Sequence, residues 1–207
     1  MSIQKNAGAL VERISTLSPD TGRLIVAVAG APGSGKSTLA EAVVQRLKAA
    51  GEAAVLMPMD GFHLDNRLLE TRGMLSRKGA PETFDFGGLA SAISRIRAGE
   101  PVFLPVFNRS REESIAGAAE ISADTRIIVV EGNYLLLDEA PWTTLAPFWD
   151  LTVFLDVDTA ELERRLVSRW IGYGYDMTIA RAKAESNDLP NAQRVTEGFR
   201  GADLILT

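Results

Sequence analysis

The sequence predicts an α/β fold in three layers, with a central and mostly parallel sheet that helices cover on both faces. Three observations lead to this prediction: several short apolar runs, helical patterns between them, and a glycine-rich turn between the first run and the helix after it. The 207 residues, 46% of them hydrophobic, are enough to bury one substantial core, so we expect a single domain over residues 1–207.

Five continuously apolar runs are predicted to be buried strands. Strands covered on both faces lack the alternation of apolar and polar residues that half-exposed strands show. A sixth segment, residues 101–107, contains two prolines, so we expect an edge strand or an extended loop there. The five runs span residues 24–29, 53–58, 127–131, 151–156 and 202–206.

The predicted helices lie between these runs. Leu10, Ile14 and Leu17 fall on one helical face ahead of a turn-forming stretch, residues 18–22. The apolar spacing from residue 39 to 47 predicts a helix that ends near Gly51 and completes a βαβ unit. Further helices are expected at residues 89–97 and 159–170.

Composition excludes several classes of protein. The net charge of −5 and the pI near 5.1 argue against general attraction to nucleic acid or to an anionic membrane surface. The chain has no cysteine and a single histidine, His63, which excludes disulfides, thiolate metal sites and multi-histidine metal centres. No apolar run is long enough to span a bilayer, and the N-terminus lacks a long apolar stretch. We therefore expect a soluble cytoplasmic protein.

A complete G-x-x-x-x-G-K-[ST] pattern follows the first predicted strand and opens the first helix of the βαβ unit. Its glycines let backbone N–H groups turn inward around phosphates, and the helix N-terminus adds a positive dipole end. Lys36 is expected to reach the β- and γ-phosphates of ATP, and the Ser37 hydroxyl to bind Mg²⁺. The alternative is a glycine-rich turn without a ligand. The predicted nucleotide-binding residues are Gly30, Ala31, Pro32, Gly33, Ser34, Gly35, Lys36, Ser37 and Thr38.

Two carboxylates stand where predicted strands end, at the edge where α/β sheets bind their ligands. Asp60 follows the second strand and is either a general base for a substrate hydroxyl or the cap of the next helix. Glu131 ends an apolar strand, as a Walker B carboxylate that holds Mg²⁺ does, although many strand-terminal acids only meet solvent. His63 is either a substrate contact or a structural hydrogen-bonding group.

Together these elements resemble the superfamily of P-loop kinases that contains uridine kinase, phosphoribulokinase and bacterial pantothenate kinase. The overall pattern is most similar to short bacterial nucleoside kinase-like proteins labelled fructose transport system kinase. The resemblance implies a three-layer P-loop NTPase fold with a small helical lid, Asp60 as the catalytic carboxylate and Glu131 as the one associated with magnesium. It is carried by residues 59–62, 72–75, 77–85, 131–133 and 185–191.

The resemblance implies transfer of the γ-phosphoryl group of ATP to a hydroxyl of a small molecule, and a sugar such as fructose is the expected acceptor. Where pantothenate kinases carry a tyrosine and histidine pair, this chain has residues 106–113 without either. A nucleoside such as uridine and a pantothenate-like acceptor stay open as alternatives. So does a regulatory ATPase or sensor that phosphorylates no acceptor, whereas a GTPase is disfavoured because no Asn-Lys-x-Asp motif occurs.

Arginines are the remaining candidates. Arg109 is expected to contact the acceptor together with Asp60, His63 and Glu131, while Arg111 is left open because both arginines can pair with neighbouring glutamates. A lid over approximately residues 165–190, with glycines suited to a hinge at 172 and 174, is expected to close over ATP. Arg169 on this lid is assigned a catalytic role with Asp60 and Lys36. For Arg165, Asn187 and Asn191, ligand contacts and purely structural roles are both open.

Overall fold

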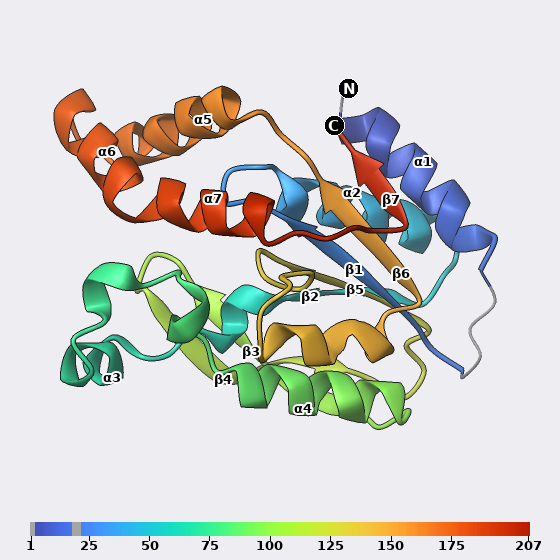
Figure 1. Ribbon diagram of the computed structural model, residues 1–207. Coiled ribbons are helices and arrows are strands. Elements are labelled where there is room, and N and C mark those ends of the chain that lie inside the picture. Colours follow the sequence, from blue (N-terminus) through green and yellow to red (C-terminus); the bar gives the residue numbers. More distant parts are fainter. Residues whose placement is uncertain (1–2, 18–21) are drawn as a thin grey trace.

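The computed structural model describes residues 3–17 and 22–207 of the chain. Its main sheet is parallel, in the spatial order β2-β5-β1-β6-β7 (Figure 1). The five predicted runs are these strands. The last strand begins two residues later than predicted, because the Asp203 carboxylate accepts the Thr152 N–H at 2.8 Å. The bounds are Leu24–Gly30 (β1), Ala54–Pro58 (β2), Ile127–Gly132 (β5), Leu151–Leu155 (β6) and Leu204–Leu206 (β7).

Helices connect and cover these strands. The predicted helices are all present, with the first one at Ile3–Ser15, while residues 18–21 of the predicted turn lie outside the described residues. Short 3₁₀ turns occur at Met59–Phe62, Leu75–Arg77, Pro81–Thr83 and Trp142–Phe148, and a π-helix occurs at Ala184–Asp188. The α-helices are Ile3–Ser15 (α1), Lys36–Ala49 (α2), Asn66–Thr71 (α3), Phe86–Arg97 (α4), Thr159–Gly172 (α5), Met177–Lys183 (α6) and Leu189–Glu197 (α7).

The sheet divides the interior into two hydrophobic cores. On one face α1 and α2 bury Leu10 and Leu39 against alternate strand residues such as Val26. On the other face α4 buries Ile93 against the intervening residues, such as Ile25. Each strand is therefore apolar on both faces, which is why the five runs lack alternation. The three-layer α/β/α prediction is confirmed.

A second, two-stranded sheet confirms the edge-strand alternative for residues 101–107. This segment is strand β3 (Val102–Asn108), which lies outside the main sheet and pairs antiparallel with β4 (Glu113–Ile121). Pro105 sits at a register shift between Leu104 and Val106, where a residue without an N–H is tolerated. We did not predict β4, because its alanines, glycine and glutamates have low strand propensity.

The predicted lid corresponds to the second half of α5, α6, the π-helix and the start of α7 (Figure 1). A small separate core of Leu166, Val167, Ala180 and Ala184 joins these helices. The helix α5 continues to Gly172 rather than ending at Trp170, and Gly174 has a φ of 91° in the turn that follows. Among the described residues, no helix is both long and apolar enough to cross a membrane.

Candidate active site

The register of the main sheet brings the predicted phosphate loop and both carboxylates to one edge. Glu131 on β5 pairs with Val28 on β1 and with Pro58 on β2. The loop begins two residues beyond Val28, and Asp60 stands two residues beyond Pro58. The donor and acceptor candidates are therefore neighbours at the carboxyl ends of three adjacent strands, as expected for an α/β ligand site.

The phosphate loop has a backbone that requires glycine. Gly33 and Gly35 have φ values of 81° and 94°, in the left-handed region, and α2 begins at Lys36 directly after them. A Cβ on Gly30 would lie 2.9 Å from the carbonyl oxygen of Leu155. The buried hydroxyl of Ser34 has no hydrogen-bond partner within the described part of the chain. An unpaired hydroxyl in a glycine-rich turn at a helix N-terminus fits a bound phosphate.

Lys36, Asp60 and Glu131 interact electrostatically. Burial lowers the pKa of Lys36, and the negative charges of Glu131 and Asp60 partly oppose this shift. Burial raises the pKa of Glu131, against the effects of the Lys36 charge and of a hydrogen bond from Ser37. Lys36 and Glu131 thus share one desolvated region within reach of the Asp60 charge, and a charge developing on a phosphoryl group there would be strongly stabilised.

The residues at this edge of the sheet suit Mg²⁺, and they are too few to hold a metal ion by protein ligands alone. Within residues 3–17 and 22–207, no three acidic, histidine or cysteine side chains gather into a metal-binding group. Magnesium keeps several waters and is usually bound by one or two protein oxygens together with substrate phosphates. The hydrogen-bonded pair of Ser37 and Glu131 provides two such oxygens.

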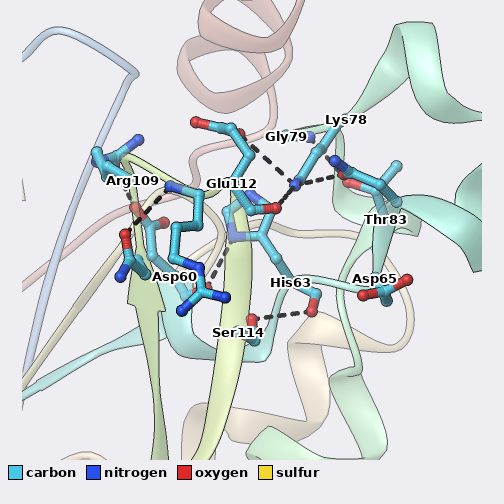
Figure 2. Close-up of polar contacts among 12 residues, drawn as sticks. Asp60, His63, Asp65, Lys78, Gly79, Thr83, Arg109, Glu112 and Ser114 are labelled. Carbon is cyan, nitrogen blue, oxygen red and sulfur yellow. Dashed lines mark hydrogen bonds and ion pairs between the residues drawn. The ribbon is translucent and has the colours of Figure 1, made fainter.

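Asp60 contacts Arg109 rather than capping a helix. It lies in the 3₁₀ turn Met59–Phe62, and its Oδ2 forms an ion pair with the guanidinium of Arg109, which follows β3 (Figure 2). The cap of α3 is Asp65, whose carboxylate accepts the Arg67 N–H at 3.0 Å. The capping alternative for Asp60 is therefore wrong. Arg111 pairs with Glu113 at 2.9 Å.

His63 is held in one orientation beside Asp60. Its ring packs between Phe84 and Phe107, with centroid distances of 4.1 and 4.6 Å. Its Nδ1 lies 2.8 Å from the Asp60 carbonyl oxygen, which can only accept a hydrogen bond, so Nδ1 carries the proton and Nε2 is an acceptor in the neutral ring. Burial lowers the pKa of His63, which favours this neutral form.

Both arginines of the predicted lid pair with protein groups. Arg165 donates to the carbonyl oxygens of Gly33 at 3.3 Å and Ser34 at 2.8 Å. Arg169 pairs with Asp188 at 3.0 Å, and its charge contributes to the lowered pKa of Lys36. Arg165 thus supports the phosphate loop, while the catalytic role of Arg169 stays a prediction.

Three connections were not predicted from the sequence. The Lys78 ammonium contacts the carbonyl oxygen of Glu112 at 2.7 Å, and the Lys78 carbonyl accepts from Asn187 at 2.7 Å. Tyr134 donates to the Gly79 carbonyl at 2.5 Å. Neither Asn187 nor Asn191 is an N-cap. The N-cap residue of the π-helix is Lys183, and that of α7 is Asp188. Only Gly79 offered a local signal, as a residue suited to a positive φ.

A groove between α5 and α7 is a poorer nucleotide site than the phosphate loop. It is lined by the acidic residues Glu163, Glu185 and Glu197 and by no lysine or arginine. Triphosphate binding needs positive charge or oriented N–H groups, which the loop at Gly30–Ser37 supplies.

Comparison with known proteins agrees with this geometry. The model of the phosphoribulokinase / uridine kinase family matches residues 25–206. The uncharacterised Escherichia coli protein YggC is 33% identical over 199 residues, covering 95% of this chain and 82% of its own. Pantothenate kinase of Enterococcus faecalis is 32% identical, covering 88% of this chain and 67% of its own.

Solved structures extend the comparison. A Silicibacter protein, assigned provisionally as a fructose transport system kinase, superposes with a TM-score of 0.92 at 46% identity and full coverage of both chains. D-glycerate 3-kinase of Cryptococcus neoformans superposes with a TM-score of 0.67 at 16% identity, over 98% of this chain and 92% of its own, which shows a shared fold. The chain therefore belongs to the phosphoribulokinase / uridine kinase family and is a P-loop kinase.

Proposed function

We propose that the protein transfers the γ-phosphoryl group of ATP to a hydroxyl of a sugar, with fructose as the first candidate. The observation that carries this proposal is the position of Asp60 beside Lys36 and Glu131, close enough for its charge to act on the pKa values of both. A carboxylate next to the transferred phosphoryl group is where a kinase needs a base for the attacking hydroxyl.

Asp60 accepts the proton of the acceptor hydroxyl as its oxygen attacks the γ-phosphorus. The new P–O bond forms while the bond to the bridging oxygen breaks, and ADP leaves with that electron pair. Arg109 occupies Asp60 Oδ2, so we assign Oδ1 to the hydroxyl. The ion pair orients the carboxylate.

Lys36 and Arg169 stabilise the charge on the phosphoryl oxygens during transfer. The amides of Gly30–Ser37 hold the phosphates in place, and Arg165 supports this loop through the carbonyls of Gly33 and Ser34. Ser37 and Glu131 would hold Mg²⁺, which neutralises phosphate charge when it is bound.

A sugar acceptor is supported by similarity and by the polar groups around Asp60. The Silicibacter protein, 46% identical over its full length, is provisionally assigned as a fructose transport system kinase. Near Asp60 the chain places the Nε2 acceptor of His63 and the guanidinium of Arg109, which suit neighbouring hydroxyls of one sugar. Pantothenate is the second candidate, because a pantothenate kinase is 32% identical over most of this chain.

The test is a panel of acceptors. Purified protein is incubated with ATP and Mg²⁺ and with fructose, other hexoses and pentoses, sugar acids, nucleosides and pantothenate, while ADP release is measured. We expect a sugar to stimulate turnover, with mass spectrometry showing one added phosphoryl group. If only pantothenate or only uridine stimulated ADP release, the proposal of a sugar acceptor would be refuted. A rate no higher than slow hydrolysis with every acceptor would favour the regulatory ATPase instead.

A further inference from the structure

The segment from Lys78 to Thr83 connects parts of the site that the chain separates widely. The Lys78 side chain is only 13% exposed, although it carries a charge. Its ammonium lies 2.6 Å from Asn66 Oδ1, 2.7 Å from the Glu112 carbonyl oxygen and 5.0 Å from the centroid of the Phe107 ring. Figure 2 shows Lys78 reaching Glu112, in the same turn as Arg109. A partly buried ammonium with these partners holds the acceptor loop, residues 109–113, in place.

The backbone of the same segment is bound by side chains of two other elements. The Lys78 carbonyl accepts from Asn187 Nδ2 at 2.7 Å, and the Gly79 carbonyl accepts from the Tyr134 hydroxyl at 2.5 Å. Gly79 has a φ of 99°, which only glycine adopts without strain. This conformation lets consecutive carbonyls meet partners from two different elements, the lid and the segment after β5.

Asn187 lies in the π-helix, next to the residue that binds the lid arginine. Its neighbour Asp188 accepts from Arg169 at 3.0 Å and from the Trp170 indole N–H at 2.6 Å. Asn191, which is 2% exposed, donates to Asn187 Oδ1 at 3.3 Å and thereby directs the Nδ2 group towards Lys78. Single-turn π-helices inside α-helices often occur at functional sites. In this protein the π-helix lets the neighbouring residues Asn187 and Asp188 bond two different partners, the Lys78 carbonyl and Arg169.

We propose that Lys78 and Asn187 are positioning residues that couple nucleotide binding at the lid to the acceptor loop. The path runs from Arg169 and Asp188 through Asn187 to Lys78, and from Lys78 to Glu112 and the Arg109 that contacts Asp60. It rests on the proposed function, because the lid must respond to nucleotide for the coupling to matter. A shift of the lid moves the Lys78 carbonyl, and the Lys78 ammonium passes that movement to the loop.

The absence of native cysteine allows a specific reporter on the acceptor loop. Ser110 is exposed and bonds only locally, to Asn108, in the described contacts. An environment-sensitive fluorophore is attached to a Ser110→Cys variant, and the protein is titrated with Mg²⁺ and a non-hydrolysable ATP analogue. Calorimetry on the same protein measures nucleotide binding. We expect binding to change the fluorescence of the loop, far from the phosphate loop in sequence.

Two variants interrupt the path at different points. Asn187→Ala removes the donor to the Lys78 carbonyl, and Lys78→Met removes the ammonium while keeping the length of the side chain. Each is expected to reduce the fluorescence change about fivefold, with nucleotide affinity within about threefold of the parent. The matched controls are Gln193→Ala, an exposed amide on α7 that contacts Glu197, and Lys48→Met on the exposed end of α2.

The outcomes separate this proposal from the proposed function. Failure of the parent protein to bind the ATP analogue overturns both. Binding without a fluorescence change, or a change that both variants retain, overturns the coupling and leaves the kinase intact. Thermal unfolding identifies a variant that fails to fold, and the other variant then decides. The coupling is supported if the fluorescence change is lost in Asn187→Ala and Lys78→Met and kept in both control variants.

Discussion

The two sides of the site are built in different ways. On the donor side, one run of residues, Gly30–Ser37, forms the phosphate loop between a fully buried strand and its helix. On the acceptor side, Asp60 and Arg109 come from segments 49 residues apart, and Arg109 is 61% exposed. Local chain geometry therefore specifies the donor side, while tertiary packing assembles the acceptor side. Changes on the acceptor side should alter acceptor use and leave ATP binding intact.

Asp60→Asn is expected to have the largest effect, because Asn cannot accept the proton of the attacking hydroxyl. Acceptor-stimulated ADP release should fall by about 10²- to 10⁴-fold, while ATP affinity measured by calorimetry stays close to that of the wild type. Asp65→Asn is the matched control, since Asp65 caps α3 and Asn caps a helix about as well, so turnover and stability should both stay close to the wild type. Full activity of Asp60→Asn would remove Asp60 from the mechanism.

Gly61→Ala should disrupt the acceptor side without touching the phosphate loop. A Cβ there would lie 2.2 Å from the Pro105 carbonyl oxygen, so β3 must move away from the turn that carries Asp60. We expect a loss of about 1–3 kcal/mol in the free energy of unfolding and a loss in kcat/KM for the acceptor of roughly tenfold to a hundredfold. Gly22→Ala, ahead of β1, is the control, because no atom lies within 4 Å of the added Cβ there. An acceptor kcat/KM equal to that of the wild type would contradict the packing argument.

Arg109→Met tests the ion pair with Asp60 directly. We expect the KM for the acceptor to rise roughly tenfold, because the Asp60 carboxylate loses the group that orients it and the acceptor loses a donor. The KM for ATP should change little. Arg111→Met removes a neighbouring arginine that pairs with Glu113 instead, and it should behave like the wild type. Equal effects of the two substitutions would assign both arginines to general surface charge.

His63 should show the smallest effect, seen in its titration. Its signals in NMR are unambiguous because the chain has one histidine. Burial lowers the pKa of His63 below the usual 6.5. The Asp60 charge opposes this shift, while the charges of Lys78 and Arg109 add to it. Since the unfolded chain then binds the proton more readily, stability should fall as the pH drops from 6.5 through the folded pKa. A midpoint at or above 6.5 would contradict the packing of the ring. His63→Phe should lack this pH dependence.

The sequence by itself determined the α/β class, the five strands of the main sheet and the phosphate loop. Each depends on neighbouring residues: the strands on continuous apolar runs, and the loop on glycines that permit positive φ before α2. The strand ends also placed Asp60 and Glu131 at one edge, because parallel strands align their carboxyl ends. The roles of these two carboxylates stay predictions.

Only the tertiary structure decided the contacts on the acceptor side. The hairpin strand β4 lacks strand-forming residues and is held by pairing with β3. The pairing of Asp60 with Arg109, and the contacts of Lys78 with Glu112 and Asn187, join segments whose spacing in the chain carries no signal. Side chains that meet across such distances are chosen by the packing of whole elements, which local patterns of residues do not encode.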